Sequence, residues 1–116
     1  ALLIAPPGFG KTAVAASVIS ERRVSTLILV HKTVLLEQWS KRLSEYYKID
    51  IKSIGILGKG KKKLNGVLDV ATLQSLKNRP ELIENYSQII IDEAHHMPAV
   101  SFEIPLKRFK GKYVLG

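Results

Sequence analysis

Short apolar runs alternate with longer segments of helical period along this chain, and this alternation limits the possible folds more than any other feature. The runs are rich in Ile, Leu and Val, a composition typical of strands that are buried on both faces of a sheet. The pattern predicts an α/β fold: a mostly parallel sheet with helices on both faces. We expect strands at residues 2–5, 27–30, 51–57, 67–71, 89–91 and 113–115.

The clearest helix follows Thr33, which is available as its N-cap. Leu35, Trp39 and Leu43 are spaced to lie on one face of this helix, so Trp39 is expected in the core. An Ala- and Val-rich segment at 11–19 predicts another helix.

Two further helices and a loop are expected in the second half. Thr72 can cap a third helix, and Pro80 suits the first turn of a short fourth one. The glycine- and lysine-rich stretch 58–66 predicts a turn or mobile loop.

Composition excludes several classes of protein. Hydrophobic residues make up 46% of the chain and charged residues 24%, which argues against disorder. Cysteine is absent, so disulfides and cysteine-ligated zinc sites are excluded. The sequence has no apolar run long enough to span a bilayer and no secretory leader, so we expect an intracellular protein.

The formal net charge of +8 favours a polyanionic partner, because bound cations release the counterions of a polyanion. Two runs of basic residues carry much of this surplus. They are Lys52, Lys59, Lys61, Lys62 and Lys63, and Lys107, Arg108, Lys110 and Lys112. Each run is either a nucleic-acid contact or a solvated loop.

Each distinctive polar cluster comes directly after a predicted strand. These clusters are residues 5–12, 31–33, 72–74 and 92–96. Open α/β sheets bind ligands beyond the carboxyl ends of their strands, so the four clusters are expected to share one rim.

Residues 5–12, APPGFGKT, form a candidate phosphate loop between a strand and a helix. Gly8 and Gly10 allow successive backbone amides to point inward, so the loop from Pro7 to Thr12, including Phe9, is expected to bind nucleotide. Lys11 would reach the β and γ phosphates, and the Thr12 hydroxyl would ligate magnesium. Ala5 replaces the first glycine of the usual pattern, and a chance match to so short a pattern is the alternative.

Asp92 and Glu93 follow three isoleucines and are expected to emerge from a buried strand at the rim. Asp92 would hold magnesium through water, and Glu93 would polarise the attacking water. The alternative is a helix start with capping carboxylates. For His95 we expect a hydrogen bond beside the nucleotide rather than metal ligation, since the chain offers no obvious tetrahedral ligand set.

Four segments in this order, 5–12, 27–33 (LILVHKT), 69–75 (DVATLQS) and 92–95 (DEAH), resemble the first RecA-like domain of a superfamily 2 helicase or translocase of the DEAH type. The subgroup that the chain resembles includes the motor subunits of type III restriction enzymes and related DNA repair helicases. The resemblance covers nearly the whole chain.

The resemblance implies ATP and Mg²⁺ as cofactors, with the roles given above for Lys11, Thr12, Asp92 and Glu93. It also implies that His95 couples the nucleotide to the next motif and that Thr33, Thr72 and Gln74 lie along a nucleic-acid backbone. For these three, helix capping or a hydrogen bond within the rim is the alternative. DNA rather than RNA is expected from the subgroup alone.

The chain departs from the family pattern in several places. Pro7 stands where threonine is usual, and the Ser/Thr-Ala-Thr motif and the second RecA-like domain are absent. Residues 1–116 are therefore expected to be a partial helicase ATP-binding domain, truncated at both ends, that alone binds ATP weakly and hydrolyses it poorly.

Two other functions compete with a motor. One is a nucleic-acid-binding module with a vestigial nucleotide site, which the presence of Lys11, Thr12, Asp92 and Glu93 disfavours. The other is a phosphate-loop kinase or GTPase, which explains neither the DEAH segment nor the basic surplus.

Overall fold

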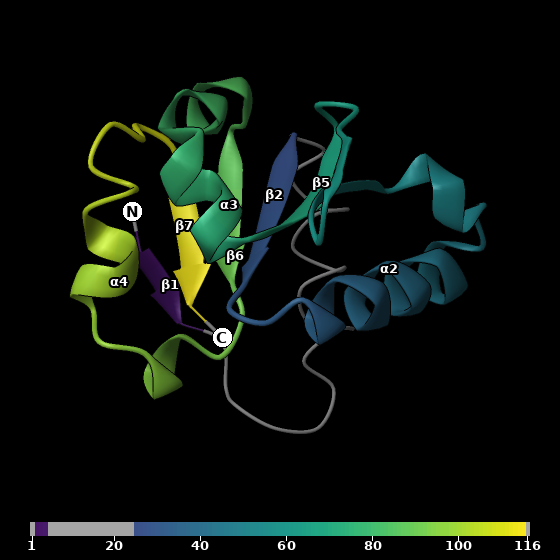
Figure 1. Ribbon diagram of the computed structural model, residues 1–116, viewed down its shortest axis with the longest axis horizontal. Helices are drawn as coiled ribbons and strands as arrows, with labels where there is room; N and C mark the ends of the chain where they lie inside the picture. Colours follow the sequence, from purple (N-terminus) through teal and green to yellow (C-terminus); the bar gives the residue numbers. More distant parts are fainter. Residues whose placement is uncertain (1, 5–24, 116) are drawn as a thin grey trace.

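The computed structural model describes residues 2–4 and 25–115. Their strands form one sheet in the order β1-β7-β6-β2-β5-β3-β4 (Figure 1). The strands are β1 (Leu2–Ile4), β2 (Thr26–Val30), β3 (Gly55–Gly58), β4 (Lys61–Lys63), β5 (Leu68–Thr72), β6 (Gln88–Ile91) and β7 (Lys112–Leu115). Every neighbouring pair is parallel except the β3-β4 hairpin, which confirms the mostly parallel sheet.

Helices cover both faces of the sheet. The long helix α2 (Val34–Tyr47) lies on one face, and α3 (Leu73–Asn78), the 3₁₀ helix η2 (Pro80–Asn85) and α4 (Val100–Glu103) lie on the other (Figure 1). Two short 3₁₀ segments, η1 (Ile51–Ser53) and η3 (Ala94–His96), lie in connections. None of the helices in the described part of the chain has the length and apolar character needed to cross a bilayer.

The strand residues alternate between two separate cores. In β2, Ile28 and Val30 pack with Trp39 beneath α2, whereas Leu27 and Leu29 join the cluster beneath α3, η2 and α4. This is the period-2 alternation of a strand buried on both faces. The predicted core position of Trp39 is confirmed, because its side chain is 1% exposed.

The strand predicted at 51–57 starts later than expected. Residues Ile51–Ser53 form η1, whose N-cap Asp50 accepts a hydrogen bond from the Lys52 amide at 3.0 Å. The expected loop at 58–66 also contains the edge strand β4, which pairs with β3 although its three residues are all lysine. Backbone pairing with β3 here outweighs the low strand propensity of lysine.

The predicted helix starts at Thr33, Thr72 and Pro80 are confirmed, with two differences. Thr72 accepts a hydrogen bond from the Ser75 amide at 3.2 Å, whereas Thr33 occupies the N-cap position of α2 without a capping side-chain bond. Pro80 opens a 3₁₀ rather than an α-helix. The helix expected at 11–19 lies outside the described residues.

A buried polar network stabilises the amino-terminal end of β5. The Asp69 carboxylate, fully buried, accepts hydrogen bonds from the Tyr86 hydroxyl at 2.5 Å and from the backbone amides of Asn65 and Gly66 at 3.0 and 2.9 Å. A β-carbon on Gly55 would lie 1.8 Å from Asp69 Oδ1, so this close approach requires glycine. Burial, together with the hydrogen bond to Asp69 and its negative charge, raises the pKa of Tyr86 above its ordinary value.

We predict that Tyr86→Phe lowers the free energy of unfolding by about 2 kcal/mol at pH 7, because a buried carboxylate loses a donor. Urea unfolding followed by the fluorescence of Trp39, the one tryptophan of this chain, measures it. Tyr46→Phe is the matched control: Tyr46 is 50% exposed, so its loss of a hydroxyl should cost less than about 0.5 kcal/mol.

The difference in unfolding free energy between wild type and Tyr86→Phe should also depend on pH. The unfolded tyrosine loses its proton above about pH 10, whereas folded Tyr86 keeps it because its pKa is raised. The stabilisation that Tyr86 contributes is therefore complete below about pH 10 and declines as the pH rises further. The gap between wild type and Tyr86→Phe should narrow at alkaline pH; a constant gap would contradict this account.

Candidate functional site

The carboxyl ends of β2, β5 and β6 meet at one edge of the sheet. In register, Val30 lies opposite Thr72, and Leu29 lies opposite Ile91. The polar cluster 31–33 follows Val30, and the cluster 92–96 follows Ile91. The third cluster, 72–74, begins at Thr72 itself. The predicted shared rim is therefore confirmed for these three clusters.

The strand before the glycine loop ends at this same edge. Ile4 is opposite Leu115 of β7, and Leu115 is opposite Ile91 of β6. Two strand spacings, about 10 Å, thus separate the end of β1 from the end of β6. The loop itself, Pro7, Gly8, Phe9, Gly10, Lys11 and Thr12, lies outside the described residues, as do the contacts predicted for it.

Asp92 continues the alternation of β6 by one residue beyond the strand. Its backbone amide donates to the carbonyl oxygen of Leu29 at 2.9 Å, which extends the ladder between β6 and β2. Since Ile90 packs beneath α2, the side chain two residues later is directed to that same face. There Trp39 Nε1 donates to Asp92 Oδ2 at 2.8 Å, and the Asp92 side chain is buried.

Glu93 breaks the alternation. It adopts the left-handed conformation, with φ 57° and ψ 34°, which costs a non-glycine residue about 1–2 kcal/mol. Backbone strain of this kind is common at functional sites. Glu93 precedes η3 but makes no capping side-chain bond, so the capping alternative does not describe it.

The Glu93 and His95 side chains lie together at the rim. His95 Nε2 is 3.4 Å from Glu93 Oε2, and both side chains are partly exposed. Among the described residues no group of three or more His, Cys, Asp and Glu side chains could hold a metal ion. The predicted hydrogen bond between His95 and a nucleotide stays a prediction.

The three residues predicted to follow a nucleic-acid backbone differ in accessibility. Thr33 and Gln74 are exposed at the starts of α2 and α3. Thr72 is buried, and its hydroxyl both accepts from the Ser75 amide and donates to Ser75 Oγ at 2.7 Å. Helix capping therefore accounts for the Thr72 hydroxyl, while Thr33 and Gln74 lie where a ligand at the rim can reach them.

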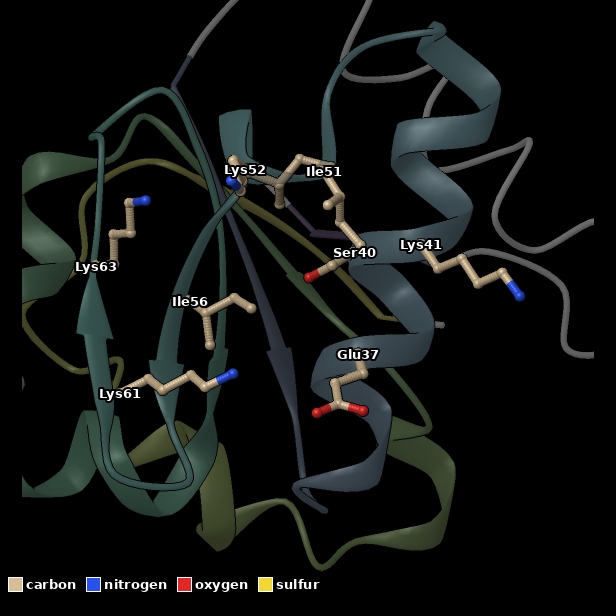
Figure 2. Close-up of a pocket in the computed structure, with 9 residues that line it drawn as sticks. Glu37, Ser40, Lys41, Ile51, Lys52, Ile56, Lys61 and Lys63 are labelled. Atoms are coloured by element: carbon tan, nitrogen blue, oxygen red, sulfur yellow. The ribbon is translucent and has the colours of Figure 1, made fainter.

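The first lysine run lies in η1 and in the β3-β4 hairpin, whose turn after Gly58 is beside Thr72 at the rim. A hollow of about 480 Å³ separates this hairpin from α2; Ile51, Ile54 and Ile56 line it with lysines at its margin (Figure 2). Figure 2 shows Lys61 of the hairpin and Glu37 of α2 extending into the gap from its two sides. Lys52, Lys61 and Lys63 of the first basic run line this hollow, whereas Thr33, Thr72 and Gln74 do not.

The lysines of β4 also have a structural explanation, because charged side chains on an edge strand discourage pairing with another chain. The second basic run lies near the start of β7, whose register with β6 puts it at the opposite edge of the sheet from Asp92. One of its members, Arg108, pairs with Glu84 at 3.2 Å. Of the two runs, only the first reaches toward the rim, at Lys59 and Lys61 beside Gly58, whereas Lys52 precedes β3 and Lys63 lies nearer its amino-terminal end.

Sequence reasoning missed the contact between Trp39 and Asp92. The helical spacing of Trp39 indicated burial but gave no signal for the partner of its indole N–H. The need for glycine at position 58 was also missed: Gly58 has φ +142°, and a β-carbon there would approach Leu36 and Thr72 to about 3.0 Å. A glycine at the end of a predicted strand, beside the rim, was the available signal.

Comparison with known proteins agrees with this geometry. The model of the family "Type III restriction enzyme, res subunit" matches residues 1–116. A DNA 3'-5' translocase, XPB2 of Sulfurisphaera tokodaii, is 36% identical over 99% of this chain and 26% of its own length. The probable helicase D10 of Escherichia phage T5 is 29% identical over 90% of this chain and 24% of its own length.

The crystal structure of T4 UvsW has a similar fold. It superposes with a TM-score of 0.74 over 98% of this chain and 26% of the UvsW chain, at 22% identity. The chain thus spans about a quarter of the length of the curated relatives that it matches. It belongs to the family of the res subunit of type III restriction enzymes and has the fold of the first RecA-like domain of a superfamily 2 helicase.

Proposed function

We propose that this chain is the ATP-binding half of a helicase or translocase that couples ATP hydrolysis to movement on DNA. The register of β1, β7 and β6 carries the proposal, because the strand before the glycine loop and the strand before Asp92 end level at one edge. A gap of about 10 Å between them is one that a magnesium-bound triphosphate can bridge.

In this proposal the glycine loop holds the phosphates. Backbone amides around Gly8 and Gly10 donate to phosphate oxygens, and Lys11 neutralises charge on the β and γ phosphates. Pro7 and Phe9 complete the loop without supplying charge. The Thr12 hydroxyl, one residue further on, would ligate magnesium.

The acidic residues fit the remaining tasks. A carboxylate oxygen is a ligand that Mg²⁺ prefers, and the Asp92 carboxylate is fixed at the rim by its backbone bond to Leu29 and by Trp39. Bound magnesium would neutralise charge that develops on the phosphates. Glu93, which its left-handed backbone turns out of the strand alternation, would orient and polarise the attacking water. His95, adjacent to Glu93, would sense the nucleotide and couple it to the following motif.

DNA is the proposed track, because the similar relative from Sulfurisphaera tokodaii is named a DNA translocase and the chain has a net charge of +8. Thr33 and Gln74 are the proposed contacts to the backbone, since both are exposed at the rim. Thr72 would act indirectly, through the N-cap that fixes the start of α3 and thereby Gln74. A DNA track also makes an intracellular location the natural proposal.

A second RecA-like domain of the parent chain is the proposed partner. Closure of that domain on the rim would complete the nucleotide site and supply arginines to the phosphates, so that cycles of hydrolysis become steps along the track. The 116 residues alone should therefore bind ATP weakly and hydrolyse it poorly.

We predict that Glu93→Gln in the full-length parent lowers ATP turnover at least about a hundredfold while ATP binding is retained, because a general base is lost but the phosphate contacts are not. A coupled ATPase assay and equilibrium binding of a labelled ATP analogue measure the two effects. Glu84→Gln is the matched control: Glu84 is exposed and forms an ion pair with Arg108 at 3.2 Å, so turnover should be unchanged. Negligible turnover in the wild-type parent, unchanged in Glu93→Gln, would instead support a nucleic-acid-binding module with a vestigial nucleotide site, and substantial turnover that is unchanged would refute the role of Glu93.

We predict that Gln74→Ala weakens DNA binding by the parent about fivefold, the loss expected for one hydrogen bond to a phosphate. Because Gln74 is neutral, the dependence of affinity on salt should keep its slope. Fluorescence anisotropy with labelled DNA across a salt series checks both. Gln38→Ala, at an exposed position on α2, is the matched control and should bind like wild type; equal losses in the two variants would refute the assignment of Gln74.

A further inference from the structure

We propose that Trp39 is a positioning residue for the magnesium site: its indole N–H holds the Asp92 carboxylate in the orientation that the cation requires. This inference rests on the proposed function of Asp92 as the magnesium-holding carboxylate. It assigns a role to a side chain whose helical spacing indicated only a core residue.

The contact joins two elements that are far apart in the chain. Trp39 lies in α2 and Asp92 lies directly after β6, 53 positions later, yet Nε1 and Oδ2 are 2.8 Å apart in a buried environment. The length is typical of a hydrogen bond between an N–H group and a charged oxygen. The Asp92 backbone is fixed independently, by its amide bond to Leu29. Main chain and side chain of Asp92 are thus held from two different elements.

The chemistry of the donor suits a magnesium carboxylate. An indole N–H only donates and carries no charge, so it orients the carboxylate without cancelling its negative charge. An arginine or lysine at the same place would form an ion pair and compete with the cation. A carboxylate has about four lone-pair sites, of which an indole N–H takes one.

Packing fixes the indole itself. Trp39 is 1% exposed and lies in the core cluster with Leu36 and Leu43 of the same helix, so its ring has little freedom to rotate. Ser40 Oγ donates to the Leu36 carbonyl oxygen at 2.8 Å and satisfies the neighbouring buried hydroxyl within the helix. A rigid hydrogen-bond donor behind a metal-binding carboxylate holds that carboxylate in the narrow range of orientations in which it can bind the metal.

A purely structural explanation makes a different prediction. A buried indole N–H needs an acceptor, and Asp92 would supply one without consequence for magnesium. In that case, loss of the N–H would change stability alone. The positioning role requires that the response of the enzyme to magnesium changes as well.

The test replaces Trp39 in the full-length parent with 3-benzothienylalanine, which keeps the bicyclic ring and has sulfur in place of the N–H. We expect the Mg²⁺ concentration for half-maximal ATPase activity, measured at saturating ATP, to rise about tenfold, the loss expected for one hydrogen bond to a charged group. Trp39→Phe, made genetically, should shift it in the same direction. An unchanged Mg²⁺ requirement in the benzothienyl protein would overturn the proposal.

Leu43→Val is the matched control for packing. Leu43 is fully buried in the same cluster and on the same helix as Trp39, but its side chain has no polar atom. It should lower the melting temperature and leave the Mg²⁺ requirement as in wild type. A shift in the Mg²⁺ requirement as large as that of the benzothienyl protein would show that core packing alone sets it, and would also overturn the proposal.

A spectroscopic measurement tests the contact without turnover. In parent protein labelled with ¹⁵N-tryptophan, the indole resonance of Trp39 is identified by its loss in Trp39→Phe. We expect this resonance to move in Asp92→Asn, and in wild type to move with Mg²⁺ plus a non-hydrolysable ATP analogue but not with the analogue alone. A resonance that responds to neither change would count against the proposal.

The outcomes separate this inference from the function on which it rests. ATPase activity that depends on Glu93 but has the same Mg²⁺ requirement with and without the indole N–H defeats the positioning role alone. Full activity in Glu93→Gln defeats the proposed function, whatever the behaviour of Trp39.

Discussion

Parallel pairing of β6 with β2 on one side and β7 on the other fixes where the polar clusters of this protein lie. Parallel strands in register end at the same edge, so any residue that follows a strand is delivered to that edge. Ile91 is level with Leu29 and with Leu115, and Leu115 is level with Ile4. Three described clusters and the strand that leads to the glycine loop therefore meet at one rim without any side-chain contact being needed to bring them together.

The two edges of the sheet are used differently. At the amino-terminal edge, Asp69 is fully buried and satisfied by Tyr86 and two backbone amides, an arrangement that stabilises the fold and leaves no carboxylate for a ligand. At the carboxyl-terminal edge, Glu93 is partly exposed and held in a strained backbone conformation. Asp69 has its hydrogen bonds satisfied within the fold, whereas Glu93 has a strained backbone and an accessible side chain. This contrast indicates that the functional site lies at the carboxyl-terminal edge.

Local backbone geometry sends the side chains of the two neighbouring acids, Asp92 and Glu93, into different surroundings. Asp92 keeps the strand alternation and is therefore directed beneath α2, where Trp39 binds it. Glu93 leaves that alternation through a left-handed turn, so that two adjacent residues need not point to opposite faces. One acid can then be rigid and buried while the other remains accessible beside His95.

Sequence by itself determined the class of fold, the positions of most strands along the chain and the identity of the rim clusters, because these depend on hydrophobic period and on short motifs that are local in the chain. Tertiary structure alone decided three other matters. The all-lysine segment Lys61–Lys63 became a strand only because β3 offered it a pairing edge, and the hydroxyl of Thr72 was committed to Ser75 rather than left for a ligand. Likewise, the spacing of Trp39 predicted its burial, but its donation to Asp92 depends on how α2 packs across the sheet, and side chains 53 positions apart meet only when the whole chain has folded.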